Sequence, residues 1–99
     1  MTLNILRRDG GCGALCAEIL AELPEWFGMP APNAAYADLA EIGPAWLAMD
    51  DGRPIGLMIL KSHGEALENY LLCVRRASHG GGAGRALLDQ AEAELKELG

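Results

Sequence analysis

The sequence predicts a single α+β domain in which helices flank a mostly antiparallel sheet, and three observations predict it. A chain of 99 residues suits one hydrophobic core, so residues 1–99 are expected to form one domain. A composition that is 51% hydrophobic and 22% charged is typical of a folded protein and excludes disorder. The hydrophobic patterns follow the order strand, helix, helix, strand, strand, strand, helix, which favours helices packed against a sheet.

The first half of the chain predicts one strand and two helices. Leu3–Arg8 alternates apolar and polar residues, as a strand does, and a glycine pair follows it. Apolar residues spaced three and four apart over Cys12–Leu23 predict an amphipathic helix, which the next proline ends. After a proline-rich loop at 24–32, Asn33 is a good N-cap for a shorter helix that runs to Ile42.

The second half predicts a hairpin, a further strand and a long helix. Ala45–Asp50 and Pro54–Lys61 are strands, and Asp51-Gly52 between them supplies the positive φ values of a tight turn. Near-continuous apolar residues in the second of these strands favour a central place in the sheet. Glu68–Val74 predicts another strand, and Ala83–Leu98 carries the leucine stripe of an amphipathic helix.

Charge and hydropathy exclude several classes of partner. The formal net charge of −6 repels a phosphate backbone, so we expect no nucleic acid as a partner. No apolar run approaches the roughly 20 residues that a membrane-spanning helix needs, and we expect no membrane association. The N-terminal residues lack the order of a secretory signal, which predicts a cytoplasmic protein.

The cysteines and histidines do not predict a metal site. Three cysteines, Cys12, Cys16 and Cys73, in a chain without a secretory signal favour free thiols. Cys12 and Cys16 would share a helical face, where they are expected to be small buried residues. The two histidines, His63 and His79, lie in unrelated glycine-containing contexts without ligand spacing. We therefore expect no bound metal.

The segment after the last predicted strand points to an anion site. Glycines at 80–82 and at 84 connect that strand to the long helix, and such a junction presents backbone N–H groups at the positive end of the helix dipole. Arg75, Arg76 and Arg85, with His79, form a local positive cluster beside it. The chain lacks the Gly-Lys-Ser/Thr of a P-loop, and it stops too soon after the glycines for a dinucleotide fingerprint. The alternative is a plain strand-to-helix connection.

The run from Glu68 to Leu88 resembles the core motif of the GCN5-related N-acetyltransferases, the GNAT superfamily. Its strand reads Glu-Asn-Tyr-Leu-Leu-Cys-Val, its loop His-Gly-Gly-Gly-Ala-Gly, and its helix starts Arg-Ala-Leu-Leu. The preceding hairpin and the two earlier helices also fall where this family has them. The resemblance implies the family's α/β/α sandwich with a mostly antiparallel mixed sheet.

The same resemblance implies acetyl transfer from acetyl-coenzyme A to an amine of a small molecule or protein. Glu68 matches the base that deprotonates the amine through water in many members. The acceptor pocket is implied around Trp26, Phe27, Met29 and Tyr36. The coenzyme would bind along the last strand and the glycine loop, at Leu72, Cys73, Val74, His79, Gly80, Gly81, Gly82, Ala83, Gly84 and Arg85. The acidic surface favours a cationic amine.

The chain also departs from the family pattern. His79 stands where Arg or Gln is usual, Gly81 where a cation is common, and Arg76 where proline is common. The family normally continues beyond the residue corresponding to Gly99 with a fifth strand, a fourth helix and two further strands, so the C-terminal part is expected to be missing here. Neither Tyr36 nor Tyr70 matches the general acid of that part.

An uncovered fourth strand would be an apolar edge, which is prone to pairing. We therefore expect a homo-oligomer that pairs through this strand, or a shortened product of a longer gene. Three functions stay open at this point: an N-acetyltransferase, an inactive remnant that binds coenzyme A or a partner chain, and a pure interaction module.

Overall fold

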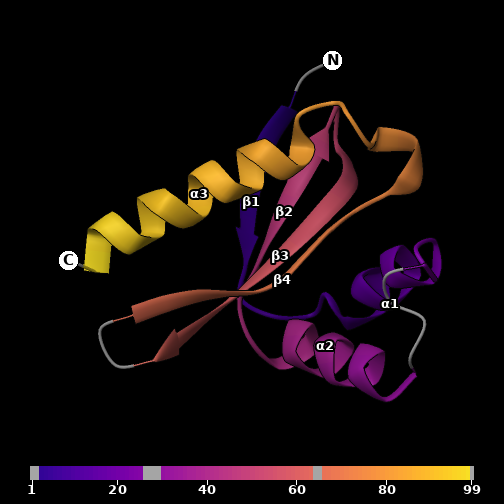
Figure 1. Ribbon diagram of the computed structural model, residues 1–99, viewed down its shortest axis with the longest axis horizontal. Helices are drawn as coiled ribbons and strands as arrows, with labels where there is room; N and C mark the ends of the chain where they lie inside the picture. Colours follow the sequence, from indigo (N-terminus) through magenta and orange to yellow (C-terminus); the bar gives the residue numbers. More distant parts are fainter. Residues whose placement is uncertain (1–2, 26–29, 64–65, 99) are drawn as a thin grey trace.

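The computed structural model describes residues 3–25, 30–63 and 66–98. The predicted order of elements is confirmed, with one short 3₁₀ helix added before the last helix (Figure 1). The elements are β1 (Leu3–Arg8), α1 (Gly13–Ala21), α2 (Pro30–Ile42), β2 (Ala45–Asp50), β3 (Arg53–His63), β4 (Ala66–Val74), η1 (Arg76–Ser78) and α3 (Ala83–Leu98).

The four described strands form one sheet in the order β1-β2-β3-β4, and each is antiparallel to its neighbour. The turn between β2 and β3 has φ values of 50° at Asp51 and 83° at Gly52. This pair of left-handed residues is what the Asp-Gly dipeptide predicts, because it matches the twist of the two strands. The apolar β3 is central, as expected, and β4 lies at the edge of the described sheet.

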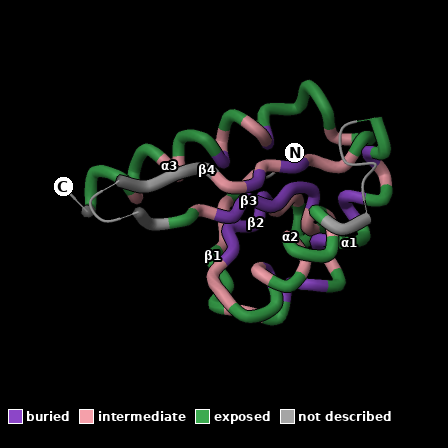
Figure 2. The backbone as a smooth tube through the Cα atoms, turned by 60° about the horizontal axis from the view of Figure 1, so that its bottom comes forward, coloured by how far each residue is buried: buried purple, intermediate pink, exposed green. Residues whose placement is uncertain are grey.

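The sheet is covered on both faces, which gives the predicted sandwich (Figures 1 and 2). On one face α1 and α2 pack on alternate strand residues, and on the other face α3 does so. The first core consists of Cys12, Cys16, Ile19, Leu20, Leu23, Ala40, Ala45, Leu47, Leu57, Ile59, Leu71 and Cys73. The second consists of Trp46, Ala48, Ile55, Met58, Ala83 and Leu87. Neighbouring strand residues belong to different cores because successive side chains of a strand point to opposite faces of the sheet.

Several boundaries differ from the sequence prediction, and helix α1 ends at Ala21, two residues before the predicted Leu23. Helix α2 begins at Pro30, three residues before Asn33, because proline is tolerated in the first turn of a helix, where its missing N–H has no partner to lose. The hairpin of β3 and β4 extends further than predicted, to His63 and from Ala66. Within the described ranges, no helix has the length and apolar character needed to cross a membrane.

Candidate functional site

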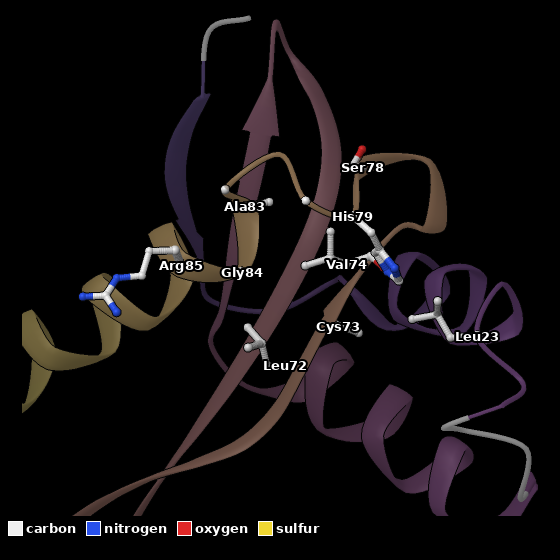
Figure 3. Close-up of a pocket in the computed structure, with 11 residues that line it drawn as sticks. Leu23, Leu72, Cys73, Val74, Ser78, His79, Ala83, Gly84 and Arg85 are labelled. Carbon is white, nitrogen blue, oxygen red and sulfur yellow. The ribbon is translucent and has the colours of Figure 1, made fainter.

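A groove runs along the open edge of β4 and ends at the N-terminus of α3 (Figure 3). Its volume is about 630 Å³. One wall comes from the end of α1, the floor from β4, and the other wall from the glycine loop and the first turn of α3. The lining residues are Leu23, Leu72, Cys73, Val74, Ser78, His79, Gly80, Gly82, Ala83, Gly84 and Arg85. We call this the edge groove.

The edge groove unites most of the residues that the sequence pointed to. Nine of the ten candidate coenzyme-binding residues line it. The tenth, Gly81, is exposed and lies outside the lining, and its N–H donates to the Ser78 carbonyl at 3.2 Å. Two lining residues, Leu23 and Ser78, were not predicted. Leu23 carried only the signal of a core leucine at the end of the first helix, and indeed it is 2% exposed.

The backbone of β4 faces the edge groove at alternate residues. The Arg75 N–H donates to the Ile55 carbonyl at 2.7 Å, and the register pairs Val74 with Gly56 and Cys73 with Leu57. Because the hydrogen-bonding direction alternates along an antiparallel strand, the backbone groups of Cys73 point to β3 and those of Val74 point outward. By the same alternation Leu72 points outward, so two residues of β4 offer main-chain groups to the edge groove.

The glycine loop leaves the first turn of α3 open to the edge groove. The Ala86 N–H donates to the Gly82 carbonyl at 2.9 Å, which begins the helical bonding pattern. The three N–H groups before it, at 83–85, have no acceptor within the helix, as at any helix start. Gly80 and Gly82 have φ values of 82° and 90°, and a Cβ on either would meet no atom within 4 Å. The space beside these glycines is therefore open, and a bulky anion fits against the backbone there.

His79 holds the glycine loop to the end of β4. Its Nε2 lies 2.7 Å from the Val74 carbonyl oxygen, so this nitrogen donates the hydrogen bond. The side chain is exposed and crosses over the edge groove toward Val74 in Figure 3. His79 thus donates a hydrogen bond to the outward-facing carbonyl of Val74 at the open edge of the strand.

The structure corrects the expected positive cluster. Arg75 and Arg76 do not line the edge groove but point to carboxylates around the end of α1. Arg85 does line the edge groove, and its Nε lies 3.0 Å from Asp89, one turn later in α3. The local guanidinium groups are therefore paired within the protein. For Arg75 and Arg76 the sequence pattern did not reveal this, because their carboxylate partners lie far away in the chain.

Arg75 and Arg76 join Glu18, Glu22 and Glu25 in what we call the arginine–glutamate cluster. Burial acts to lower the pKa of Arg75, but its hydrogen bonds to Glu22 and Glu18 outweigh burial and raise the pKa. The hydrogen bond from Arg76 lowers the pKa of the exposed Glu25 carboxyl. Both arginines are therefore already engaged by carboxylates within the protein.

The predicted base, Glu68, lies in β4 opposite Lys61 of β3. Its side chain is outside the described part of the structure, as are Trp26, Phe27 and Met29 of the predicted acceptor pocket. Tyr36 of that pocket is described: its ring packs edge-on against Tyr70 at a centroid distance of 5.6 Å.

A bulge in β4 sets the position of Tyr70. Leu71 opposes Ile59 and Asn69 opposes Leu60, so Tyr70 is the extra residue on its strand. A bulge of this kind leaves backbone groups outside the regular ladder and turns the side chain. Tyr70 lines a second cavity of about 240 Å³, which α2, β3 and β4 form together.

The cysteines behave as small core residues, as the sequence predicts. All three thiols are free and buried. Burial raises the pKa of Cys16 to about 11 and that of Cys73 to about 12. Over the residues that the structure describes, no group of three or more histidine, cysteine or acidic side chains is arranged to hold a metal ion.

Comparison with protein families gives a match to the family described as "Acetyltransferase (GNAT) family" over residues 14–99. A search of curated protein sequences finds no match. Among solved structures, a ribosomal-protein-alanine N-acetyltransferase from Brucella melitensis biovar Abortus 2308 superposes with a TM-score of 0.74 at 22% identity, covering 98% of this chain and 74% of the other.

Two further structures share the fold. Apo-form YjaB from Escherichia coli has a TM-score of 0.67 at 22% identity, covering 95% of this chain and 67% of its own. N-acetylglutamate synthase from Neisseria gonorrhoeae, complexed with coenzyme A and N-acetyl-glutamate, has a TM-score of 0.73 at 22% identity. The match covers 100% of this chain but 24% of the synthase, so the chain spans only a part of this relative.

Proposed function

Since the chain belongs to the acetyltransferase (GNAT) family, we propose that it transfers an acetyl group from acetyl-coenzyme A to an amine of a small molecule or protein in the cytoplasm. The observation that carries the proposal is the edge groove. It joins an open strand edge to an anion-binding helix N-terminus, and coenzyme A has a matching order of an amide-containing arm and a pyrophosphate.

The residues of the edge groove fit this coenzyme. The open space beside Gly80 and Gly82 admits the pyrophosphate, and the N–H groups at 83–85 donate to it. The outward backbone groups of Leu72 and the outward N–H of Val74 would hydrogen-bond the amides of the arm, as an added strand would, while the Val74 carbonyl accepts from His79. When bound, acetyl-coenzyme A supplies an activated acyl thioester. The role of the protein is then to align the amine with it and to remove the proton of the amine.

The acceptor amine is assigned to the N-terminal half of β4. Glu68 lies there and would accept the proton of the amine through water, and the bulge at Tyr70 interrupts the regular strand pairing close by. Tyr36 contacts Tyr70 from α2, and the other two residues proposed for the acceptor pocket, Trp26 and Phe27, lie outside the described residues. No metal is needed for this reaction.

Two measurements test the proposal. Calorimetry with acetyl-coenzyme A should show binding, and a thiol-release assay over polyamines, aminoglycosides, amino acids and peptides should show turnover with at least one amine. Family membership favours this outcome over the alternative of a domain that binds coenzyme A without turnover. Binding without thiol release from any amine would support that alternative instead.

A single substitution tests the place of binding. Gly82→Trp fills the open space of the edge groove and should abolish binding of the coenzyme. Because Gly82 has φ of 90°, the change also strains the loop, and circular dichroism must show that the fold is kept. A folded variant that still binds acetyl-coenzyme A would show that the assignment of the loop is wrong.

A further inference from the structure

The arginine–glutamate cluster connects three elements that border the edge groove. The Arg75 side chain is only 17% exposed and bonds in three directions. Its Nε donates to the Pro54 carbonyl at 2.9 Å, its Nη1 to Glu22 at 2.6 Å, and its Nη2 to Glu18 at 3.0 Å. One guanidinium thus joins the start of β3 and the last turn of α1 to the residue that follows β4.

Arg76 extends the same connection into the loop after α1. Its backbone N–H donates to Glu22 at 3.2 Å, so the one carboxylate of Glu22 binds both arginines. The Arg76 guanidinium donates to the Glu22 carbonyl at 2.8 Å, which satisfies a carbonyl at the end of a helix, and pairs with Glu25. Arg76 is also the first residue of η1, the turn that leads to His79 and the glycines.

Both walls of the edge groove lie next to these contacts in the chain. Leu23, which lines the groove from the α1 side, follows Glu22 directly, and Ser78 and His79 on the loop side follow Arg76 by two and three residues. Figure 3 shows Leu23 projecting toward β4 from the α1 side, with Arg85 on the opposite, α3 side. Because Glu22 is bound to Arg75 and to Arg76 at once, a shift of the α1 end would also shift the glycine loop.

We propose that Arg75 and Glu22 are positioning residues that fix the spacing of the two walls of the edge groove, and that neither arginine of the cluster binds the coenzyme phosphates. This inference rests on the proposed function for the identity of the ligand. It assigns the phosphates to backbone groups of the glycine loop, and it gives the two arginines an indirect role through Glu22 and Leu23.

The sign of one substitution separates this role from direct phosphate binding. Glu22→Gln removes a negative charge near the edge groove and breaks the one carboxylate contact that Arg75 and Arg76 share, while Arg75 keeps Glu18 and Arg76 keeps Glu25. If the arginines bound phosphate, the change would strengthen binding of coenzyme A. If they position the walls, the change weakens it by about tenfold or more, as expected when a charged hydrogen bond is lost. Glu92→Gln on the exposed surface of α3 is the control for the charge and should leave the dissociation constant unchanged.

Calorimetry with coenzyme A is run on the wild type, Glu22→Gln, Arg75→Gln and the double variant. The two single changes should weaken binding similarly, and the double variant should be no weaker than either, because both break the same connection. Arg75→Lys keeps the charge, but its three N–H groups share one nitrogen and cannot span the separate acceptors of Nε, Nη1 and Nη2, so it should resemble Arg75→Gln. Ile19→Val in the core of α1 lowers the melting temperature without touching the cluster and should bind normally. Tighter or unchanged binding by Glu22→Gln would overturn the inference.

Hydrogen exchange without ligand gives a second readout. Glu22→Gln and Arg75→Lys should speed exchange of the amides at 76–82 by about tenfold, while the amides of the central strand β3 keep their protection. If the wild type does not bind coenzyme A, the proposed function fails, and this exchange result alone decides the positioning role. Unchanged exchange at 76–82 would then reject it.

Discussion

Gly84 gives a test in which stability and ligand binding should change in opposite directions. It is the second residue of α3 and lines the edge groove. A Cβ built on it would lie 3.9 Å from the nearest side-chain atom, Cγ2 of Val74, which is an ordinary van der Waals contact. The protein itself therefore accepts alanine at this position, and Gly84→Ala places a methyl group in the groove.

The gain in stability follows from the helix. Alanine restricts the unfolded chain more than glycine does, and in a helix the exchange is worth about 0.5–1 kcal/mol. For a domain of this size, 1 kcal/mol corresponds to a rise in melting temperature of roughly 4–8 °C. Gly84 lies near the start of its helix, so we expect the lower part of this range by thermal denaturation followed by circular dichroism.

The loss in binding follows from the backbone approach. The methyl group adds bulk to the lining of the edge groove in the first turn of α3, and it should remove one charge-assisted hydrogen bond to the pyrophosphate. Such a bond is worth about 1.5–3 kcal/mol, so the dissociation constant for acetyl-coenzyme A should rise by about 10- to 150-fold. Calorimetry measures this directly. Glu92→Ala, on the exposed side of α3, is the control and should leave binding unchanged.

A dissociation constant within twofold of the wild type would refute the reasoning, because it would mean that the phosphates do not approach the first turn of α3. A fall in melting temperature would refute the predicted gain in stability, since it would show that position 84 does not accept a Cβ as the structure indicates.

Three other predictions concern the base, the thiols and the open strand. Glu68→Gln should lower kcat by about 10²–10⁴-fold with little change in the affinity for acetyl-coenzyme A, measured by thiol release and calorimetry; an unchanged kcat would remove Glu68 from the mechanism. Burial raises the pKa of Cys73 to about 12 and that of Cys16 to about 11, so the native thiols should stay unreactive toward an aromatic disulfide reagent at pH 8, while all three should react in denaturant. Rapid labelling of the native protein would contradict this and would also disturb the thiol-release assay. Finally, the open edge of β4 should support concentration-dependent pairing of chains, which light scattering would detect and saturating coenzyme A should reverse, because both use the outward groups of Leu72 and Val74. A clean monomer at all concentrations would count against pairing.

The features that were predictable from the sequence are those that local patterns determine. The two-residue and 3.6-residue periods of apolar positions placed the seven strands and helices in order, and Asp51-Gly52 identified the hairpin. The glycine loop was likewise recognisable, because a strand followed by glycines and a helix is a local signal. The start of α2 was misplaced because Asn33 is a good cap in isolation, yet the chain is already helical from Pro30.

Contacts between distant parts of the chain could not be predicted in this way. Arg75 and Arg76 stand beside the glycines in sequence, which left open whether they face the anion site or point elsewhere; their partners lie more than 50 residues earlier, on α1 and just after it. The bulge at Tyr70 also depends on how β4 pairs with β3, and the sequence of β4 alone does not predict it. Ion pairs and bulges depend on which elements the fold brings together, whereas periodicity and turn residues do not.

Because the arginines are paired with carboxylates, we expect backbone N–H groups rather than guanidinium groups to bind an anion in the edge groove. The dependence of binding on ionic strength tests this expectation. Around the groove the guanidinium groups of Arg75, Arg76 and Arg85 are bound to the four carboxylates of Glu18, Glu22, Glu25 and Asp89, so these side chains offer no net positive charge. Binding through backbone N–H groups and a helix dipole acts only at short range. Raising the salt concentration from about 50 to about 300 mM should therefore change the dissociation constant for coenzyme A by less than about twofold, since screening acts mainly on exposed charges. If binding weakened severalfold over that range, at least one arginine would have to leave its carboxylate and contact the phosphates, and the sequence-based interpretation of the positive cluster would be restored.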